Sequence, residues 1–518
     1  MKRKKIMSVI AAVFMSATMA LGTVVFTGCG EKTDPSAIQI SVSKLGYGTE
    51  WLHNIARAYT EKTGNTVQIT EEIGQEGNSK IIQQIESLSG KADIAFVEKD
   101  VAKYVYDGSV SAGGVNYDCL FADLSDVYNA ELPGEFGKTI ESKMRKETRD
   151  YLNFDGKYYS LPWAGGITGI VINNTKWKEL GFKDADIPLT TEQLFEVCDK
   201  IADKKASPFI YSAGDEYYSM FSPVWFAQYE GRANMDGFLA GRDPEGNVSE
   251  YIYSYDGQRA TLNVMKKLLA AKYQDSASES LDFSDMQGYF LNGRSVFCVN
   301  GAWLEIEMRN SATADIRFMK TPVVSEIVNK TPSLTEAARN AGVSSDEILV
   351  KVIKEIDEGK TSSEIAGITQ VDFNIVKEAR GIAYITTGTS AQAVIPAYAA
   401  NIEKAKDFLK FFYSDEGLNI YYTTLKGATI PVTPTNGYAG EIQLSDFRKS
   451  VNQAEESGIT FNYSSKAKIF VSGGVDKYFR NGTGSIVNNF NNGISVDKIL
   501  ADNSASVKSN WSTIRKYL

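Results

Sequence analysis

Strand-like and helix-like patterns alternate over the first hundred residues after an apolar leader. Apolar and β-branched runs at 38–43, 66–73 and 92–97 are typical of short strands, and the segments 50–62 and 79–89 between them carry apolar residues at helical spacing. This alternation predicts an α/β fold with a parallel sheet and helices on both faces. Ligands of such sheets bind beyond the carboxyl ends of the strands, so the loops after the first and third strands are the first places to expect a site.

A second block of the same kind begins near Tyr151. A glycine-rich turn at 165–169 leads into a strand at 170–173, and no segment repeats at the period of a solenoid. The further patterns, in chain order, are helices at 191–203 and 255–271, an apolar segment at 290–303, a helix-rich stretch at 333–380, a strand at 382–386 and a helix at 402–413.

The first residues have the pattern of an export signal. A basic start (Lys2 to Lys5) precedes an apolar run from Ile6 to Phe26, and small residues lead to Cys29. The sequence Phe26-Thr27-Gly28-Cys29 resembles the lipobox of bacterial lipoproteins, with Phe26 where leucine is usual. We therefore expect residues 1–28 to be a lipoprotein signal peptide, Cys29 to be lipidated, and 29–36 to be a tether. An uncleaved membrane anchor is the alternative, and both place the rest of the chain outside the cytoplasmic membrane.

Composition and charge exclude several classes of function. The chain is 43% hydrophobic and 23% charged, which is ordinary for a globular protein, and its formal net charge is −9. Such an acidic surface disfavours nucleic acid and anionic lipid as partners. His53 is the single histidine, and the four cysteines have no Cys-x-x-Cys spacing. We therefore expect no metal site, no cofactor and no thiol chemistry.

Four segments together resemble the extracellular solute-binding proteins of carbohydrate ABC transporters, of the family 1 type. They are Gly46-Tyr-Gly-Thr-Glu-Trp51 before a helix ending at Lys62-Thr63-Gly64, Asp155-Gly-Lys-Tyr-Tyr-Ser-Leu-Pro162 leading to Gly169-Ile-Val-Ile-Asn173-Asn174, Phe290-x-x-Gly293-Arg294 running to Val299-Asn-Gly-Ala-Trp303, and Lys404-Ala-Lys-Asp-Phe-Leu-Lys-Phe-Phe412 followed by Ser414-Asp-Glu-Gly417. The resemblance runs from the first strand to the last helices and is interrupted by the stretch 333–380.

This resemblance implies a two-lobe, periplasmic-binding-protein-like fold of type II, with strands that cross between the lobes. On it we expect lobe 1 to comprise 37–162 and 321–425, with a helical insertion at 333–380, and lobe 2 to comprise 163–320 and 426–518. A hinge is expected near Pro162, because proline fixes φ while the glycines that follow permit reorientation. The start of the insertion, 333–344, also has the pattern of a helix-turn-helix, but a surface helical insertion fits an exported acidic chain better.

A sugar site needs flat aromatic side chains and groups that donate and accept hydrogen bonds. The resemblance places a sugar-stacking tryptophan at Trp303 and a hydroxyl-accepting acid at Glu98 or Asp100. The remaining candidates come from their places in loops or helices, and for each the alternative is packing in the core: Tyr47, Trp51, Trp163, Trp225 and Gln228.

The leading hypothesis is a membrane-tethered, monomeric binding component of an ABC importer, which captures a carbohydrate, by preference an oligosaccharide, through hinge closure. Its partners would be the sugar and the permease subunits. A binding protein for peptides or another solute keeps the fold and changes the ligand. A secreted glycan-degrading enzyme is the third reading, and it requires two carboxylates beside the sugar. Glu98, Asp100 and Glu305 are the acids that it could use.

Overall fold

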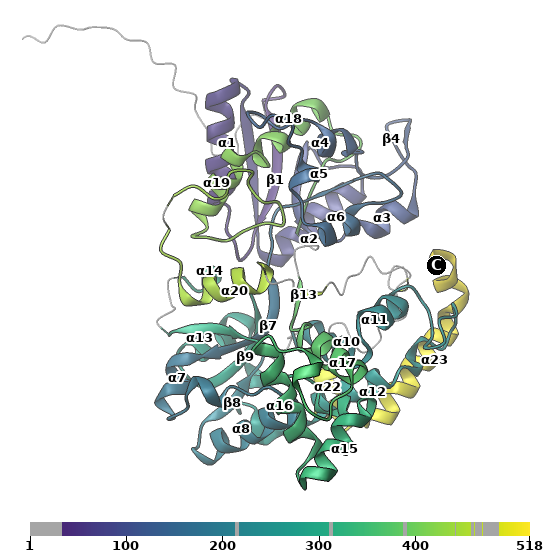
Figure 1. Cartoon of the computed structure of the whole chain (residues 1–518). Coiled ribbons are helices and arrows are strands. Elements are labelled where there is room, and N and C mark those ends of the chain that lie inside the picture. Colours follow the sequence, from purple (N-terminus) through teal and green to yellow (C-terminus); the bar gives the residue numbers. More distant parts are fainter. Residues whose placement is uncertain are drawn as a thin grey trace, which may run out of the picture.

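The computed structural model describes residues 34–212, 217–309, 314–386, 391–440, 442–456, 460–461, 469 and 486–518. These residues form two lobes, each with its own sheet, stacked one above the other (Figure 1). Among the residues described, no helix combines the length and apolar character needed to cross a membrane.

The first lobe is built on a five-stranded sheet. Its strands, in spatial order, are β2 (Val67–Ile73), β1 (Ile38–Lys44), β3 (Ile94–Glu98), β12 (Ala391–Val394) and β6 (Leu161–Pro162). The first three are parallel, with Ile40 of β1 opposite both Ile69 and Ile94, and β12 runs antiparallel to its two neighbours. The alternation predicted at 38–97 is therefore confirmed, and the carboxyl ends of β1 and β3 lie side by side.

Helices cover both faces of this sheet, as Figure 1 shows. They are α1 (Glu50–Thr63), α2 (Gly74–Glu86), α3 (Ala102–Asp107), α4 (Ser125–Asn129), α5 (Ile140–Lys143), α6 (Lys146–Leu152), α18 (Ile402–Phe412) and α19 (Asp415–Thr424), with a hairpin of β4 (Val110–Ala112) and β5 (Val115–Tyr117). The end of α1 shows why the sequence stops there. Gly64 adopts a φ of 75°, and its N–H donates to the carbonyl of Thr60 at 2.8 Å, a left-handed cap that favours glycine.

The second lobe contains a six-stranded sheet in which β7 is central. The strands are β13 (Thr460–Phe461), β11 (Tyr384–Thr386), β7 (Ile167–Asn173), β9 (Ser295–Gly301) and β8 (Ser207–Ile210) in spatial order, with β10 (Ile316–Met319) also pairing with β7. Every residue of β7 and β9 is buried. Strands covered on both faces are expected to be apolar throughout, and both strands are largely so.

The helices of this lobe lie around its sheet. They are α7 (Asn174–Glu179), α8 (Thr191–Asp203), α9 (Tyr217–Phe221), α10 (Pro223–Glu230), α11 (Arg232–Leu239), α12 (Asp256–Leu268), α13 (Phe283–Leu291), α14 (Leu304–Glu307), α15 (Pro332–Ala341), α16 (Ser345–Asp357), α17 (Gln370–Arg380), α20 (Asp446–Glu456), α22 (Ile486–Asn491) and α23 (Val496–Ile514). Short 3-10 helices are η1 (Asp184–Asp186), η2 (Ile252–Ser254), η3 (Ala271–Tyr273), η4 (Ser278–Ser280), η5 (Ser325–Lys330), η6 (Ser362–Glu364) and η8 (Arg515–Tyr517).

The chain passes between the lobes at several points. It leaves the first sheet at Pro162 and enters the second at Ile167, and it returns between β11 and β12. One expected boundary was wrong. Residues 321–386, which we assigned to lobe 1, pack in the second lobe: β11 pairs with β7, and Val323, Leu334 and Phe373 belong to the same core as α10 and α12.

The helical insertion therefore decorates lobe 2, as the position of α15, α16 and α17 in Figure 1 shows. Its last helix is tied to α16 by Arg380, whose Nη2 lies 2.7 Å from Asp357 Oδ2. Arg380 is 7% exposed, so this charge-assisted hydrogen bond is partly shielded from water and holds the end of α17 against the end of α16. The boundary after residue 425 was also wrong, because Ala428, Ile430 and Val432 pack in the core of the first lobe.

A buried ion cluster holds this late segment to the first lobe. Lys143 Nζ lies 2.7 Å from Glu135 Oε2 and 2.8 Å from Asp415 Oδ1, and Thr435 donates its hydroxyl to Glu135 and its N–H to Asp415. Burial by itself would raise the pKa of Asp415, but the hydrogen bonds from Lys143 and Thr435 outweigh burial and lower it. Residues 135–143, Asp415 and Thr435 thus meet at one cluster, in which a single lysine is shared by two carboxylates.

Candidate functional site

The loop between β1 and α1 reaches the segment that crosses between the lobes. Tyr47 follows Gly46 in this loop and is 6% exposed, and its hydroxyl donates to the carbonyl of Gly165 at 2.8 Å. Burial raises the pKa of Tyr47, so the phenol stays protonated and keeps this hydrogen bond. Tyr47 therefore connects the loop after β1 to the segment that crosses between the lobes, and its ring has little surface left for a solute.

Glu98 ends β3 beside this loop. Its carboxylate accepts from Gln75 Nε2 at 3.1 Å, and its backbone N–H donates to Asn78 at 2.9 Å. Burial raises the pKa of Glu98, and the hydrogen bond from Gln75 opposes that shift. Asp100 lies two residues further, where it accepts from the N–H of Ala102 at the start of α3 and from the hydroxyl of Tyr151.

Trp303 projects from the other lobe, directly after β9. Its indole N–H donates to the hydroxyl of Tyr217 at 3.1 Å, and the two ring centroids are 5.8 Å apart. Tyr217 in turn makes an edge contact with Phe283, at 5.1 Å. A Cβ at Gly301 would come 2.2 Å from the Trp303 ring, so the glycine makes room for it. Trp303 is partly buried and packs against the core of the first lobe, so it lies between the two lobes.

Glu307 is a site residue that sequence reasoning missed. It lies one helical turn after Trp303, and its carboxylate accepts from Gln287 Nε2 at 2.7 Å. A Cβ at Gly46 of the first lobe would come 2.2 Å from Glu307 Oε1. Burial raises the pKa of Glu307 to about 7, against the hydrogen bond from Gln287 and with a further contribution from Glu98. The available signal was the i, i+4 spacing from Trp303, which places both side chains on one face of a helix.

The two lobes thus bring aromatic and hydrogen-bonding groups to their common boundary. Lobe 2 supplies an aromatic ring with partial exposure and a carboxyl group, and lobe 1 supplies a second carboxyl group and a backbone loop. A ring face suits the C–H face of a sugar, and carboxyl groups accept from its hydroxyls. Within the described ranges, no group of three or more His, Cys, Asp or Glu side chains is arranged to hold a metal ion.

Comparison with known proteins shows the family of this chain. The profile of the bacterial extracellular solute-binding protein family matches residues 46–418, which is most of the chain. The chain belongs to that family. This solute-binding protein is therefore extracytoplasmic.

Individual relatives are distant in sequence. The multiple sugar-binding protein of Streptococcus mutans serotype c is 26% identical over 238 residues, which cover 43% of this chain and 53% of that protein. An ABC substrate-binding protein from Listeria monocytogenes, in complex with cycloalternan, has a TM-score of 0.60 at 13% identity, covering 92% of this chain and 100% of its own. RafE in complex with raffinose has a TM-score of 0.56 at 14% identity, covering 91% and 99%. These structures share the two-lobe fold of this solute-binding protein.

Two candidate tryptophans of the solute-binding protein lie in its first core. Trp51 is fully buried, and its ring stacks on that of Trp163 with centroids 5.5 Å apart and an interplanar angle of 13°. Trp163 is 2% exposed and donates its indole N–H to the carbonyl of Val97 at 3.2 Å. Neither ring has a free face for a sugar in this structure, so the expectation of Trp51 as a ligand is corrected to a packing role. Trp163 pins the crossing strand, which was one of its two interpretations.

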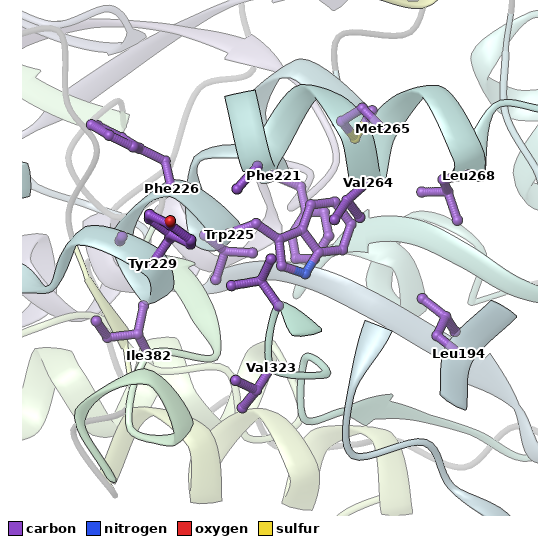
Figure 2. Packing of buried hydrophobic residues seen from close by; sticks show 14 of the residues in the cluster. Leu194, Phe221, Trp225, Phe226, Tyr229, Val264, Met265, Leu268, Val323 and Ile382 are labelled. Carbon is purple, nitrogen blue, oxygen red and sulfur yellow. The ribbon is translucent and has the colours of Figure 1, made fainter. Parts of the chain in front are cut away.

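Trp225 and Gln228 are corrected in the same way. Trp225 is fully buried in the second lobe among Phe221, Met265 and Leu268, as Figure 2 shows. Its indole N–H donates to the carbonyl of Pro322 at 3.3 Å. The Gln228 amide donates to the carbonyl of Ile382 at 2.8 Å and accepts from the N–H of Val324 at 2.9 Å, so the backbone uses both of its ends. These residues attach 321–386 to lobe 2.

Two further residues complete the account. Glu305, which the enzyme hypothesis could use, lies on α14 between Trp303 and Glu307. Because helix neighbours two residues apart point in different directions, Glu307 rather than Glu305 shares a face with Trp303. Cys29 lies outside the described residues.

Proposed function

We propose that this chain is the substrate-binding component of an ABC importer that captures an oligosaccharide between its two lobes. The observation that carries the proposal is the position of Trp303. Its ring lies between the lobes with part of its surface exposed, while Glu307 and Glu98 place hydrogen-bonding carboxyl groups from both lobes nearby. Relatives with the same two-lobe fold bind raffinose and cycloalternan, which are oligosaccharides, and this agreement supports the ligand class.

The proposed mechanism is hinge closure without chemistry. A sugar that contacts both lobes gains its full set of contacts only when they approach, so binding shifts the population toward the closed form. The permease subunits of the importer would then recognise that form. In this proposal the chain is a monomer, and it needs no cofactor, because no bond is made or broken.

The proposal includes a lipid anchor at Cys29. The lipobox-like sequence at 26–29 supports it, and a tether over 29–36 would leave both lobes free to meet a permease. Metabolic labelling with a radioactive fatty acid should label the wild-type chain and leave Cys29→Ser unlabelled. A wild-type chain that stays in the membrane fraction without the label would favour an uncleaved anchor instead.

Capture is favoured over cleavage by the state of the two carboxyl groups. A glycosidase pairs a protonated acid with an ionised carboxylate. Burial raises the pKa of Glu307 to about 7 and also raises the pKa of Glu98, so the two carboxyl groups shift in the same direction, whereas the acid and the nucleophile of a glycosidase need surroundings that push their pKa values apart. Each carboxyl group also has an amide donor beside it, Gln75 for Glu98 and Gln287 for Glu307, so the two groups have similar surroundings.

A thermal-shift screen with product analysis tests the proposed function. The protein is mixed with mono- and oligosaccharides, including raffinose, and each mixture is then checked for cleavage products. A sugar at a hundredfold excess over its Kd should stabilise the fold by about 2.7 kcal/mol. Stabilisation with intact sugar supports capture. Cleaved sugar would contradict capture and would favour an enzyme. If no sugar shifts the unfolding temperature, the ligand would instead be a peptide or another solute.

A further inference from the structure

The residues after α23 join the two lobes at a second place. Helix α23 itself belongs to the second lobe, because Ile499, Val507 and Ile514 are buried in the core that contains α10 and α12. This buried face fixes the helix, and two exposed contacts lie on its surface: Arg259 lies 2.7 Å from Asp497, and Lys508 Nζ lies 4.7 Å from the centroid of the Tyr251 ring. Anything attached rigidly to α23 therefore moves with lobe 2.

The next side chains point to opposite lobes. Leu518 lies on the second lobe, so close to Gly241 that a Cβ there would come 2.5 Å from Leu518 Cδ1. The ring of Tyr517 contacts Tyr106 of α3 in the first lobe, with centroids 6.5 Å apart and an interplanar angle of 68°. Tyr106 is supported from behind by Phe154, whose ring makes an edge contact at 5.8 Å. Leu518 thus anchors this turn to lobe 2, and Tyr517 contacts lobe 1.

This contact is remote from the one made by α14. In Figure 1, α14 lies at the left edge of the boundary between the lobes, and the end of α23 lies at the right edge beside α3. The first lobe links both of these contacts to the candidate site. The segment that starts at Glu98, whose charge acts on Glu307, continues through Asp100 to Tyr106. The lobes are thus joined on both sides of the residues that the site uses.

We propose that Tyr517 and Tyr106 form an aromatic latch that stabilises the approach of the lobes. The two rings belong to different lobes, so their edge-to-face contact exists only when the lobes are together. A contact present in one form and absent in the other shifts the population toward the form that has it. The latch rests on the lobe movement of the proposed function and on no particular solute.

The test measures the distance between the lobes in the full-length chain without any sugar. Spin labels are placed on introduced cysteines at Lys91 in lobe 1 and Lys200 in lobe 2, both exposed. Cys29→Ser removes the one cysteine outside the described residues, and the others, Cys119, Cys198 and Cys298, are buried. Double electron–electron resonance then gives the ratio of compact to extended populations.

Tyr517→Ala should lower that ratio by roughly threefold to tenfold, the range expected for one aromatic pair. Tyr517→Phe keeps the ring and should keep the ratio. Tyr106→Ala should lower it too, and the Tyr106→Ala/Tyr517→Ala double variant should be no more open than either single one. Tyr251→Ala, which removes a surface contact of α23 within lobe 2, is the matched control and should leave the ratio unchanged.

Several results would overturn the latch. They are an unchanged ratio in Tyr517→Ala, additive effects in the double variant, a Tyr517→Phe ratio as low as that of Tyr517→Ala, or a wild type that is wholly extended. Circular dichroism of each variant separates these results from the loss of α23. Because no sugar is present, failure of the latch leaves the thermal-shift result standing, and failure to find a sugar leaves the distance result standing.

Discussion

Glu307 of the second lobe lies over Gly46 of the first, so close that a Cβ on Gly46 would come 2.2 Å from Glu307 Oε1. Gly46 opens the loop that carries Tyr47, and Glu307 shares a helical face with Trp303. A side chain at position 46 would therefore force the Glu307 carboxyl group to move before the lobes could approach as closely as they do here. A single methyl group at this point therefore tests whether the approach of the lobes matters for binding.

Gly46→Ala should weaken sugar binding. Gly46 has no positive φ that would strain an alanine backbone, so the cost falls on the contact with Glu307. Overpacking of this kind costs about 1–3 kcal/mol, or roughly fivefold to 150-fold in Kd. Titration calorimetry with the best sugar from the screen measures it. Gly288→Ala on α13, where a Cβ meets only Met308 Cε at 3.8 Å, is the control and should bind normally. Equal Kd values for the two variants would contradict the role of the contact.

Glu307 should make stability depend on pH near neutrality. Burial raises its pKa to about 7 from 4.5, so the folded chain holds a proton that the unfolded chain has released. Its contribution is therefore favourable at low pH and is lost as pH rises from 4.5 to 7, by at most about 3 kcal/mol.

Glu307→Gln should remove this dependence and should be more stable than wild type at pH 8. Urea unfolding at pH 5 and pH 8 measures both proteins. Glu305→Gln, on the same short helix, serves as the comparison and should follow wild type. A wild-type slope that persists in Glu307→Gln would assign the titration to another group.

Lys143→Met should destabilise the first lobe strongly. Lys143 is 3% exposed at its side chain and is shared by Glu135 and Asp415, so its loss leaves two carboxylates without their buried cation. Breaking a buried pair in this way costs about 3–5 kcal/mol. Lys62→Met is matched to it, since Lys62 pairs with Glu416 on the same lobe but is half exposed, and it should cost less than about 1 kcal/mol. Similar midpoints for the two variants in thermal unfolding would contradict the cluster's role.

Trp225→Phe separates packing from binding. Trp225 is fully buried, and its indole N–H bonds to Pro322, so the smaller ring leaves a void and an unpaired carbonyl. We expect a loss of about 1–3 kcal/mol in unfolding free energy. The Kd for sugar should stay within twofold of wild type in calorimetry below the unfolding transition. A large loss of affinity with normal stability would return Trp225 to the binding site.

The sequence predicted where helices and strands lie along the chain better than it predicted which lobe each of them packs against. Helices at 50–62, 191–203 and 402–413 lie within a few residues of α1, α8 and α18, because apolar spacing reports which face of a helix is buried. The same spacing does not say what covers that face. For this reason the helices of 333–380 were recognised, but their attachment to lobe 2 was not. That attachment depends on β11 pairing with β7, which is a long-range contact.

For the candidate site, the sequence predicted which loops face the second lobe better than it predicted which side chains lie there. The loops after the first and third strands do meet the second lobe, as the carboxyl-end rule requires. Trp51 and Trp225 were misplaced because a tryptophan on an amphipathic pattern is equally suited to a core and to a sugar. Glu307 was missed because its burial comes from the other lobe, and no local pattern reports that.

Calorimetric titration of Trp303→Ala with the sugar that stabilises the wild type most tests the central claim directly. Trp303 is the partly exposed ring between the lobes, so its removal should weaken binding by at least a hundredfold, about 2.7 kcal/mol, with the sugar recovered intact from the wild-type cell. Trp303→Ala with wild-type affinity would show that the solute binds elsewhere. Recovery of cleaved sugar from the wild-type cell would show that the chain does more than capture it.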